Sequence, residues 1–290
     1  MSRLVAAFAV VSGVVILPGC IEGFDTLNGS DEAYYRLFDY VIDRPRVLAV
    51  TYWPPAPGAG EEVTFVALAA TPEDPVSPEV TWWACGISLD VPFVYHGADC
   101  METSLAELVG TGQSLTVRLP YYDVSGCAPS GGCFGYIPVV ATVADPDGEE
   151  TGQGITFLSP DFLDRYPYPE LDQNTWNAMI QLRIDGNEGS ATARPGSEVV
   201  LEATVLSEEP DREFSWYTTA GTFTEYGVTV ARADWSFQGD GLHVVLGRNT
   251  LVVPKESPPD SIQVYVVSIP LDAYHPSLTR FASGTIEVVR

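Results

Sequence analysis

Few side chains in this sequence have the type and spacing of a reactive site. The strongest candidate is an acidic run in which Asp145, Asp147 and Glu149 bring three carboxylates within five residues. Carboxylate oxygens are the ligands that calcium prefers, and extracellular calcium is concentrated enough to fill weak sites. The same run contains Pro146 and Gly148 and lies between two predicted strands, where a tight turn uses these residue types. Two interpretations therefore stay open, a calcium loop and a plain turn.

Residues for catalysis are sparse. The three histidines, His96, His243 and His275, are far apart, and neither HExxH nor GxSxG occurs. A phosphate-binding loop and a glycine-rich dinucleotide turn after a strand are also missing, so the usual local signatures of hydrolases and nucleotide-dependent enzymes are absent. The sequence predicts no catalytic residue, no confident metal site and no cofactor. A hydrolase whose catalytic residues meet only on folding stays as the less favoured alternative.

The cysteines indicate an exported protein. Apart from Cys20 the chain has four, Cys85, Cys100, Cys127 and Cys133, an even number that favours two disulfides in an oxidising compartment. Four cysteines allow three pairings. We favour Cys85–Cys100 and Cys127–Cys133, because each closes a short local loop. A four-thiolate metal site is the alternative, but it lacks two close CxxC pairs.

The first twenty residues have the pattern of an export signal. Arg3 precedes a mostly apolar run that is too short to span a bilayer comfortably, and small residues and a cysteine follow it. The ending LPGC at residues 17–20 resembles a bacterial lipobox. That resemblance implies cleavage after residues 1–19, a covalent lipid on Cys20 and attachment to a membrane. Ile21 in the next position favours the outer membrane, and a secreted protein cut nearby or an uncleaved anchor helix are the alternatives.

Composition and charge exclude one class of partner. The 290 residues are 46% apolar, as in folded proteins, and 39 acidic against 14 basic residues give a net charge of −25. Such a chain repels nucleic-acid phosphates, so we expect no nucleic-acid partner. Residues 46–158 hold 14 acidic and 2 basic residues. This surface either docks on a basic partner or simply keeps the protein soluble.

An internal repeat predicts two similar domains. The segment EEVTF at residues 61–65 matches SEVVL at 197–201, and EVTWW at 79–83 matches EFSWY at 213–217. Apolar residues alternate with period two in both copies, as half-buried strands require. We therefore predict an all-β protein of two tandem immunoglobulin-like β-sandwich domains, residues 46–158 and 177–290, with Trp82 and Trp216 pointing into the cores. The inward residues expected beside them are Val63, Phe65, Ala67, Ala69, Val80, Val199, Leu201, Ala203, Val205 and Phe214.

Two segments fall outside the predicted domains. Residues 20–45 form an acidic leader, in which residues 31–42 are predicted to be a short helix. Residues 159–176 are rich in proline and aspartate and are predicted to be a stiff linker.

Aromatic doublets are the candidate contact residues. Neighbours on a strand point to opposite faces, so if Trp82 and Trp216 are inward, Trp83 and Tyr217 lie on outer faces. Together with Tyr122 they could stack on sugars or anchor a protein partner. The alternative is that the leader or the other domain covers them.

The chain also resembles a known group of proteins. The lipobox, the segment RVLAV at residues 46–50, the Trp-rich strand ending at Cys85 and the segments FSWYTTAGTF (214–223), NTLVVP (249–254) and VYVV (264–267) are similar to predicted lipoproteins of myxobacteria and related lineages. No activity is assigned to that group, so the resemblance implies fold and location alone. The function expected is a membrane-anchored, non-catalytic binding or structural module of the bacterial cell envelope, with an envelope protein as partner; a glycan-binding surface protein is the alternative.

Overall fold

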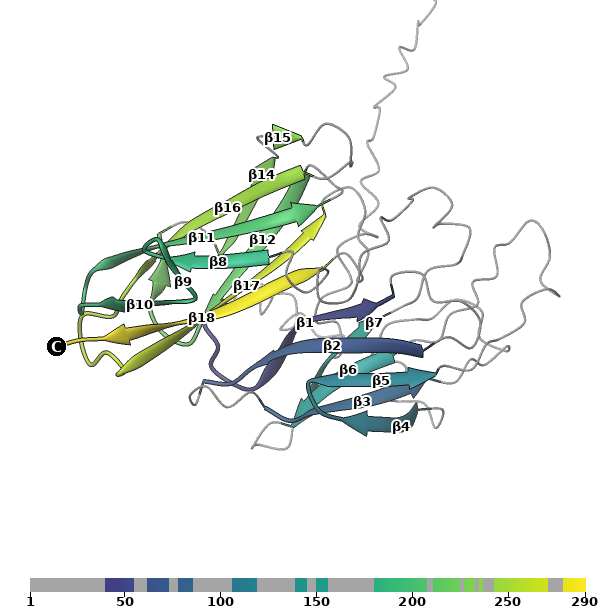
Figure 1. The fold of residues 1–290 in the computed structure, drawn as a ribbon. Helices are drawn as coiled ribbons and strands as arrows, with labels where there is room; N and C mark the ends of the chain where they lie inside the picture. The colour runs from purple at the N-terminus through teal and green to yellow at the C-terminus, as the bar shows by residue number, and fades with distance from the viewer. Residues whose placement is uncertain are drawn as a thin grey trace, which may run out of the picture.

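The computed structural model describes residues 40–54, 62–72, 78–85, 106–118, 139–144, 150–155, 180–207, 211–224, 227–232, 235–236, 243–270 and 279–290. All regular elements in these ranges are strands, and they form four sheets (Figure 1). Over the same ranges, we find no helix that has the length and apolar character to cross a membrane. The predicted all-β class is confirmed.

The first pair of sheets, called here the first sandwich, is built from residues 46–155. One sheet has the order β1-β2-β5 and the other β4-β3-β6-β7, with antiparallel pairing throughout. The strands are Arg46–Trp53 (β1), Glu62–Ala70 (β2), Val80–Cys85 (β3), Ala106–Thr111 (β4), Ser114–Arg118 (β5), Val139–Ala144 (β6) and Glu150–Ile155 (β7).

Aromatic side chains fill the centre of the first sandwich. Trp82 is fully buried, and its ring centroid lies 5.7 Å from that of Phe65, which in turn lies 5.9 Å from that of Tyr52. The indole Nε1–H of Trp82 donates to the carbonyl of Gly112, at 2.7 Å, in the turn between β4 and β5. This bond satisfies the one polar group of a buried tryptophan. The alternation in β2 places Val63, Phe65, Ala67 and Ala69 in the same core, as predicted.

The second sandwich is built from residues 180–288. Its sheets have the orders β10-β18-β17-β12-β14 and β13-β16-β11-β8-β9, and β15 also pairs with β16. The strands are Ile180–Ile184 (β8), Asn187–Glu188 (β9), Ser190–Ala193 (β10), Glu198–Ser207 (β11), Asp211–Thr218 (β12), Thr222–Phe223 (β13), Val228–Arg232 (β14), Trp235–Ser236 (β15), His243–Val252 (β16), Ser261–Pro270 (β17) and Arg280–Val288 (β18).

Both sandwiches have one topology. The sheet β1-β2-β5 corresponds to β8-β11-β16, and β4-β3-β6-β7 corresponds to β14-β12-β17-β18. In the second sandwich the first segment contributes to both sheets. Strand β8 lies in one sheet, and β10, which follows it in the chain, pairs in parallel with β18 in the other. This arrangement of three strands against four is that of an immunoglobulin-like sandwich, as predicted from the alternating pattern.

Close contact between the sheets of the second sandwich depends on Gly247. Phe214 and Trp216 project inward from β12 and are fully buried. A Cβ atom on Gly247 in β16 would lie 2.5 Å from the Phe214 ring, so only glycine lets the ring reach this strand. Trp216 donates its Nε1–H to the Thr229 hydroxyl, at 3.0 Å. Phe214, Trp216 and the inward residues of β11 were all predicted as core, and each is buried.

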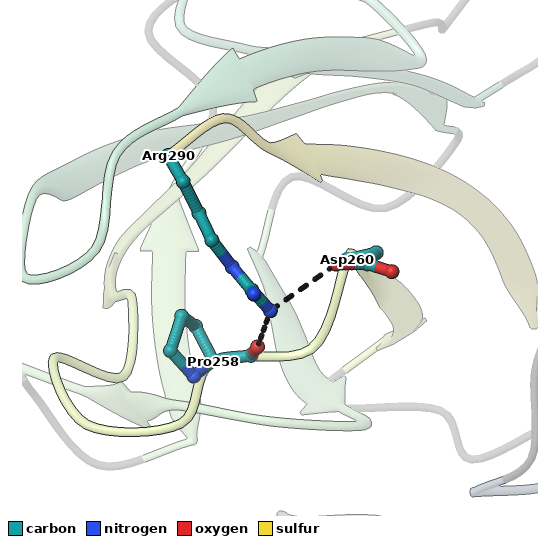
Figure 2. A network of polar contacts seen from close by, with 3 residues as sticks. All are labelled: Pro258, Asp260 and Arg290. Atoms are coloured by element: carbon teal, nitrogen blue, oxygen red, sulfur yellow. Dashed lines mark hydrogen bonds and ion pairs between the residues drawn. The ribbon is translucent and has the colours of Figure 1, made fainter.

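A small polar cluster lies beyond the end of β18. Arg290 Nη2 donates to the Pro258 carbonyl and to Asp260 Oδ1, each at 3.3 Å (Figure 2). Both charged side chains are largely exposed, so this ion pair contributes at most about 1 kcal/mol.

The predicted helix over residues 31–42 is wrong at its described end. Residues 40–42 are extended, and Val41 forms a parallel bridge with Thr218 in β12. Two physical reasons favour the extended chain. Pro45 disfavours helical geometry at Arg44, so a helix over this segment would have to end before that residue, and the edge of β12 offers backbone partners that an isolated short helix lacks.

Candidate functional site

A third apolar cluster joins the two sandwiches. It is neither of the two cores, and it explains why β1 and β17 are buried on both faces. Its buried members are Ile42 from the leader, Leu48, Ala49 and Ala70 from the first sandwich, and Tyr265 and Val267 from the second. Leu68, Tyr217, Ile269 and Phe281 pack against it and are partly buried. Strands β1 and β2 lie on the side of the first sandwich that meets the second (Figure 1).

Tyr217, one of the three candidate contact residues, lies in this interface. Its ring is 6.0 Å from the ring of Tyr40 in the leader, and the guanidinium carbon of Arg46 lies 5.2 Å from its centroid. A cation this close to an aromatic ring stabilises the contact by about 0.5–2 kcal/mol, depending on desolvation. The outer face of β12 is therefore covered here by the leader and by the first sandwich, the alternative that the sequence had left open.

The leader pairs with the second sandwich through its backbone. Ile42 N–H donates to the Thr218 carbonyl at 2.8 Å, and Thr218 N–H donates to the Tyr40 carbonyl at 2.9 Å. The neighbouring strand β14 pairs with β12 only as far as Ser215, which leaves this end of the β12 edge to the leader. We call residues 40–42 the strap. An extended peptide that adds to a sheet edge in this way is a common recognition mode.

The side chain of Tyr40 rests on a glycine. A Cβ atom built on Gly227, next to the start of β14, would collide with the Tyr40 ring. The backbone of Gly227 is not in the left-handed region, so its small size matters here and not its conformational freedom.

Burial at the strap changes the acidity of two side chains. Burial raises the pKa of Glu213, and a hydrogen bond from the Ser215 hydroxyl opposes this in part. The pKa of Tyr40 is also raised, first by burial and then by the negative charge of Glu213. Both upward shifts arise mainly because burial removes water from the charged form of each group.

Trp83 lies on the outer face of the first sandwich. It is half-buried, and its Nε1–H donates to the Thr142 hydroxyl at 3.1 Å. Leu108 on edge strand β4 is its register partner and is 55% exposed. Trp83 and Leu108 are called here the outer apolar pair.

Arg212 is a buried charge in the second sandwich. Only 1% of its surface is exposed, and its guanidinium donates to the hydroxyls of Ser207 and Ser268 and to the Ser268 carbonyl, at 2.8–2.9 Å. These bonds connect β12 to β17 and to the end of β11. A buried charge needs such bonding, which gives Arg212 a structural role.

The other predicted site residues lie outside the described residues. They are Cys20, Cys100, Cys127, Cys133, Tyr122, Asp145, Asp147 and Glu149, and of Cys85 the structure describes only the backbone, at the end of β3. The lipid site, the disulfides and the calcium loop stay predictions. Within the part of the chain that is described, no group of three His, Cys, Asp or Glu side chains lies close enough to hold a metal ion.

Sequence reasoning missed the residues that build the interface. Tyr40, Ile42 and Arg46 were assigned to the leader or to the start of a strand, and no periodicity marked them as buried. One available signal was the apolar content of both faces in RVLAV, since a strand with only one buried face alternates.

Comparisons with known proteins find only distant structural similarities. No protein-family model matches the sequence, and no curated protein matches it. Among solved structures, it is similar to red sea bream transglutaminase, at 11% identity over 89% of this chain and 33% of that chain, with a TM-score of 0.29. A structure of a carbohydrate-binding module from the β-sandwich superfamily has 12% identity over 83% of this chain and 94% of that chain, with a TM-score of 0.25. A membrane-anchored protein from Corynebacterium diphtheriae has 13% identity over 83% and 59%, with a TM-score of 0.23. All three TM-scores are far below 0.5, so nothing about the ligand or partner of this chain follows from them.

Proposed function

We propose that this protein is a lipid-anchored, non-catalytic binding or structural module of the bacterial cell envelope. The lipid is attached to Cys20, residues 1–19 are removed, and the protein stands on the outer membrane. The observation that carries the proposal is the segment LPGC at residues 17–20, which resembles a bacterial lipobox. The strap adds that the chain following Cys20 is built into the folded body at residues 40–42. The lipid anchor would therefore be connected, through the strap, to the folded body of both sandwiches.

The length of the leader supports attachment close to the membrane. About twenty residues separate Cys20 from Tyr40, and an extended chain covers at most about 3.6 Å per residue, or roughly 70 Å. The sandwiches would thus stay within about 70 Å of the lipid headgroups. Two or three acyl chains hold a soluble body firmly, since each buried methylene contributes about 0.8 kcal/mol.

Lipidation can be tested by metabolic labelling with an alkyne-bearing palmitate in the native bacterium, followed by membrane fractionation. We expect label in the wild-type protein and none in Cys20→Ser, which should leave the membrane fraction. The matched control is Cys85→Ser, which keeps the lipobox. Equal labelling of wild type and Cys20→Ser would contradict the proposal.

The outer apolar pair is the proposed contact for an envelope protein. Leu108 is exposed beside Trp83 on an edge strand, and exposed apolar groups next to an aromatic ring are typical of contact surfaces. The test is a mild-detergent pull-down of tagged, lipidated protein from native membranes, read by mass spectrometry. Leu108→Asp should remove a stoichiometric partner.

Val230 provides the control for that experiment. It is 63% exposed on edge strand β14 of the second sandwich, so Val230→Asp adds the same charge at a similar apolar position. Loss of the partner in both variants, or in neither, would contradict the assignment of the contact to the outer apolar pair. A preparation without a partner, together with saturable binding of soluble glycans that Trp83→Ala abolishes, would favour the glycan-binding alternative.

A further inference from the structure

The strap precedes the first sandwich in sequence but its backbone pairs with the second. Its two hydrogen bonds to Thr218 extend the sheet of the second sandwich beyond the point where β14 stops pairing with β12. The sheet edge at Thr218 is thus occupied by a segment that belongs, by sequence, to the start of the other sandwich.

The side chains of the strap reach both bodies. Tyr40 packs on Gly227 and Tyr217 of the second sandwich. Ile42 is 1% exposed in the cluster that also holds Leu48 of the first sandwich. Val41, between them, is 36% exposed. Alternate residues of one extended segment therefore face the interface, and the middle one faces outward.

The segment between the strap and β1 is too short to let them move far apart. Strand β1 begins at Arg46, four residues after Ile42, and four residues span at most about 14 Å. When Ile42 is bonded to Thr218, the start of β1 is therefore held near the edge of β12. Arg46, the first residue of β1, then lies over the Tyr217 ring.

From these contacts we infer that the strap is a latch that holds the two sandwiches in one fixed arrangement. Docked on β12, it keeps the outer face of β17 against β1. Released, it leaves two folded sandwiches that change their relative position. The inference does not depend on lipidation, because every contact that carries it lies within residues 40–270.

The test is hydrogen exchange in the full chain carrying Cys20→Ser, which removes the lipid. Gly227→Ala adds a Cβ where the Tyr40 ring lies, without backbone strain. We expect the amides of Ile42 and Thr218 to exchange at least about tenfold faster than in the parent, because these two amides donate across the strap contact. The amide of Thr219 donates to the Gln263 carbonyl inside the second sandwich and should keep its rate.

Two further variants make the result specific. In a Tyr40→Ala background the ring is gone, so Gly227→Ala should add no further change in exchange, a coupling that a general loss of stability would not produce. Val41→Ala should leave both amides protected. Protected β11–β16 amides in every variant show that the second sandwich remains folded.

Small-angle scattering of the same variants tests the latch itself. The parent should give a narrow distribution of intramolecular distances, and Tyr40→Ala a broader distribution that extends to larger distances. Two outcomes would overturn the inference: Ile42 and Thr218 amides that stay protected in Gly227→Ala, or rapid exchange of both amides with unchanged scattering.

Discussion

Replacing Ile42 with alanine tests the interface with the largest expected effect. Ile42 is 1% exposed although it lies outside both sandwiches in sequence. The change removes three carbons from a buried side chain, worth about 2.4 kcal/mol at roughly 0.8 kcal/mol per methylene. A residual cavity between two rigid sheets adds to this, and isoleucine-to-alanine changes in cores cost about 2–5 kcal/mol. We therefore expect the free energy of unfolding to fall by about 2.5–4 kcal/mol.

The neighbouring residue supplies the control. Val41 is 36% exposed, and Val41→Ala removes two carbons that are about two-thirds buried, so it should cost only about 1 kcal/mol at roughly 0.8 kcal/mol per fully buried methylene. Urea unfolding of the full chain with Cys20→Ser, followed by tryptophan fluorescence, measures both variants. The midpoint should shift roughly two to four times as far for Ile42→Ala as for Val41→Ala. Equal stabilities for the two variants would refute the reasoning that burial of Ile42 stabilises the contact between the sandwiches.

Three further changes test single features of the structure. Burial raises the pKa of Glu213 above 4.5, so the contribution of the protonated carboxyl to stability is fully present below pH 4.5 and is lost as the pH rises through the raised pKa. Glu213→Gln should therefore be more stable than the wild type at pH 8 and equally stable at pH 4. A stability difference between the two proteins that does not change with pH would argue against this account. Gly221→Ala should lower the free energy of thermal unfolding by at least about 1 kcal/mol, because Gly221 has a φ of 93° and a Cβ there would lie 2.6 Å from the Val252 carbonyl oxygen. An unchanged unfolding midpoint would contradict this geometry. Trp83→Ala should lower the free energy of unfolding in urea by about 1.5–2.5 kcal/mol, roughly half the cost of truncating a fully buried tryptophan, because it removes the indole packing and the bond to Thr142. A decrease of less than about 0.5 kcal/mol would mean that the indole does not pack.

Local sequence patterns were enough to predict the fold class. The alternation in VVLEATV predicts the buried residues of β11, because successive side chains of a strand point to opposite faces whatever lies beyond the strand. The same argument assigned Trp82 and Trp216 to the cores, and both are fully buried.

The leader had no such pattern. Its apolar spacing fitted a helix turn, yet residues 40–42 are extended, because the decisive partner is the edge of β12, far along the chain.

The candidate contact residues show the limit of sequence reasoning most clearly. Strand parity placed Trp83 and Tyr217 on outer faces, but parity does not say what covers an outer face. Trp83 is half-buried beside the exposed Leu108, whereas Tyr217 lies between Tyr40 and Arg46.

By itself the sequence determined the all-β class, the inward residues of the main strands and the acidic charge, since each depends on composition or on neighbours within one strand. Only the tertiary structure decided that the leader pairs with β12, that β1 and β17 are buried on both faces and that Arg212 is a structural charge inside a sandwich. The first two features depend on contacts between the two sandwiches, and the burial of Arg212 depends on how strands of the second sandwich pack together. The leader and β1 meet β12 and β17 across more than half of the chain, and Arg212 meets Ser268 across 56 residues, so no local spacing predicts these contacts.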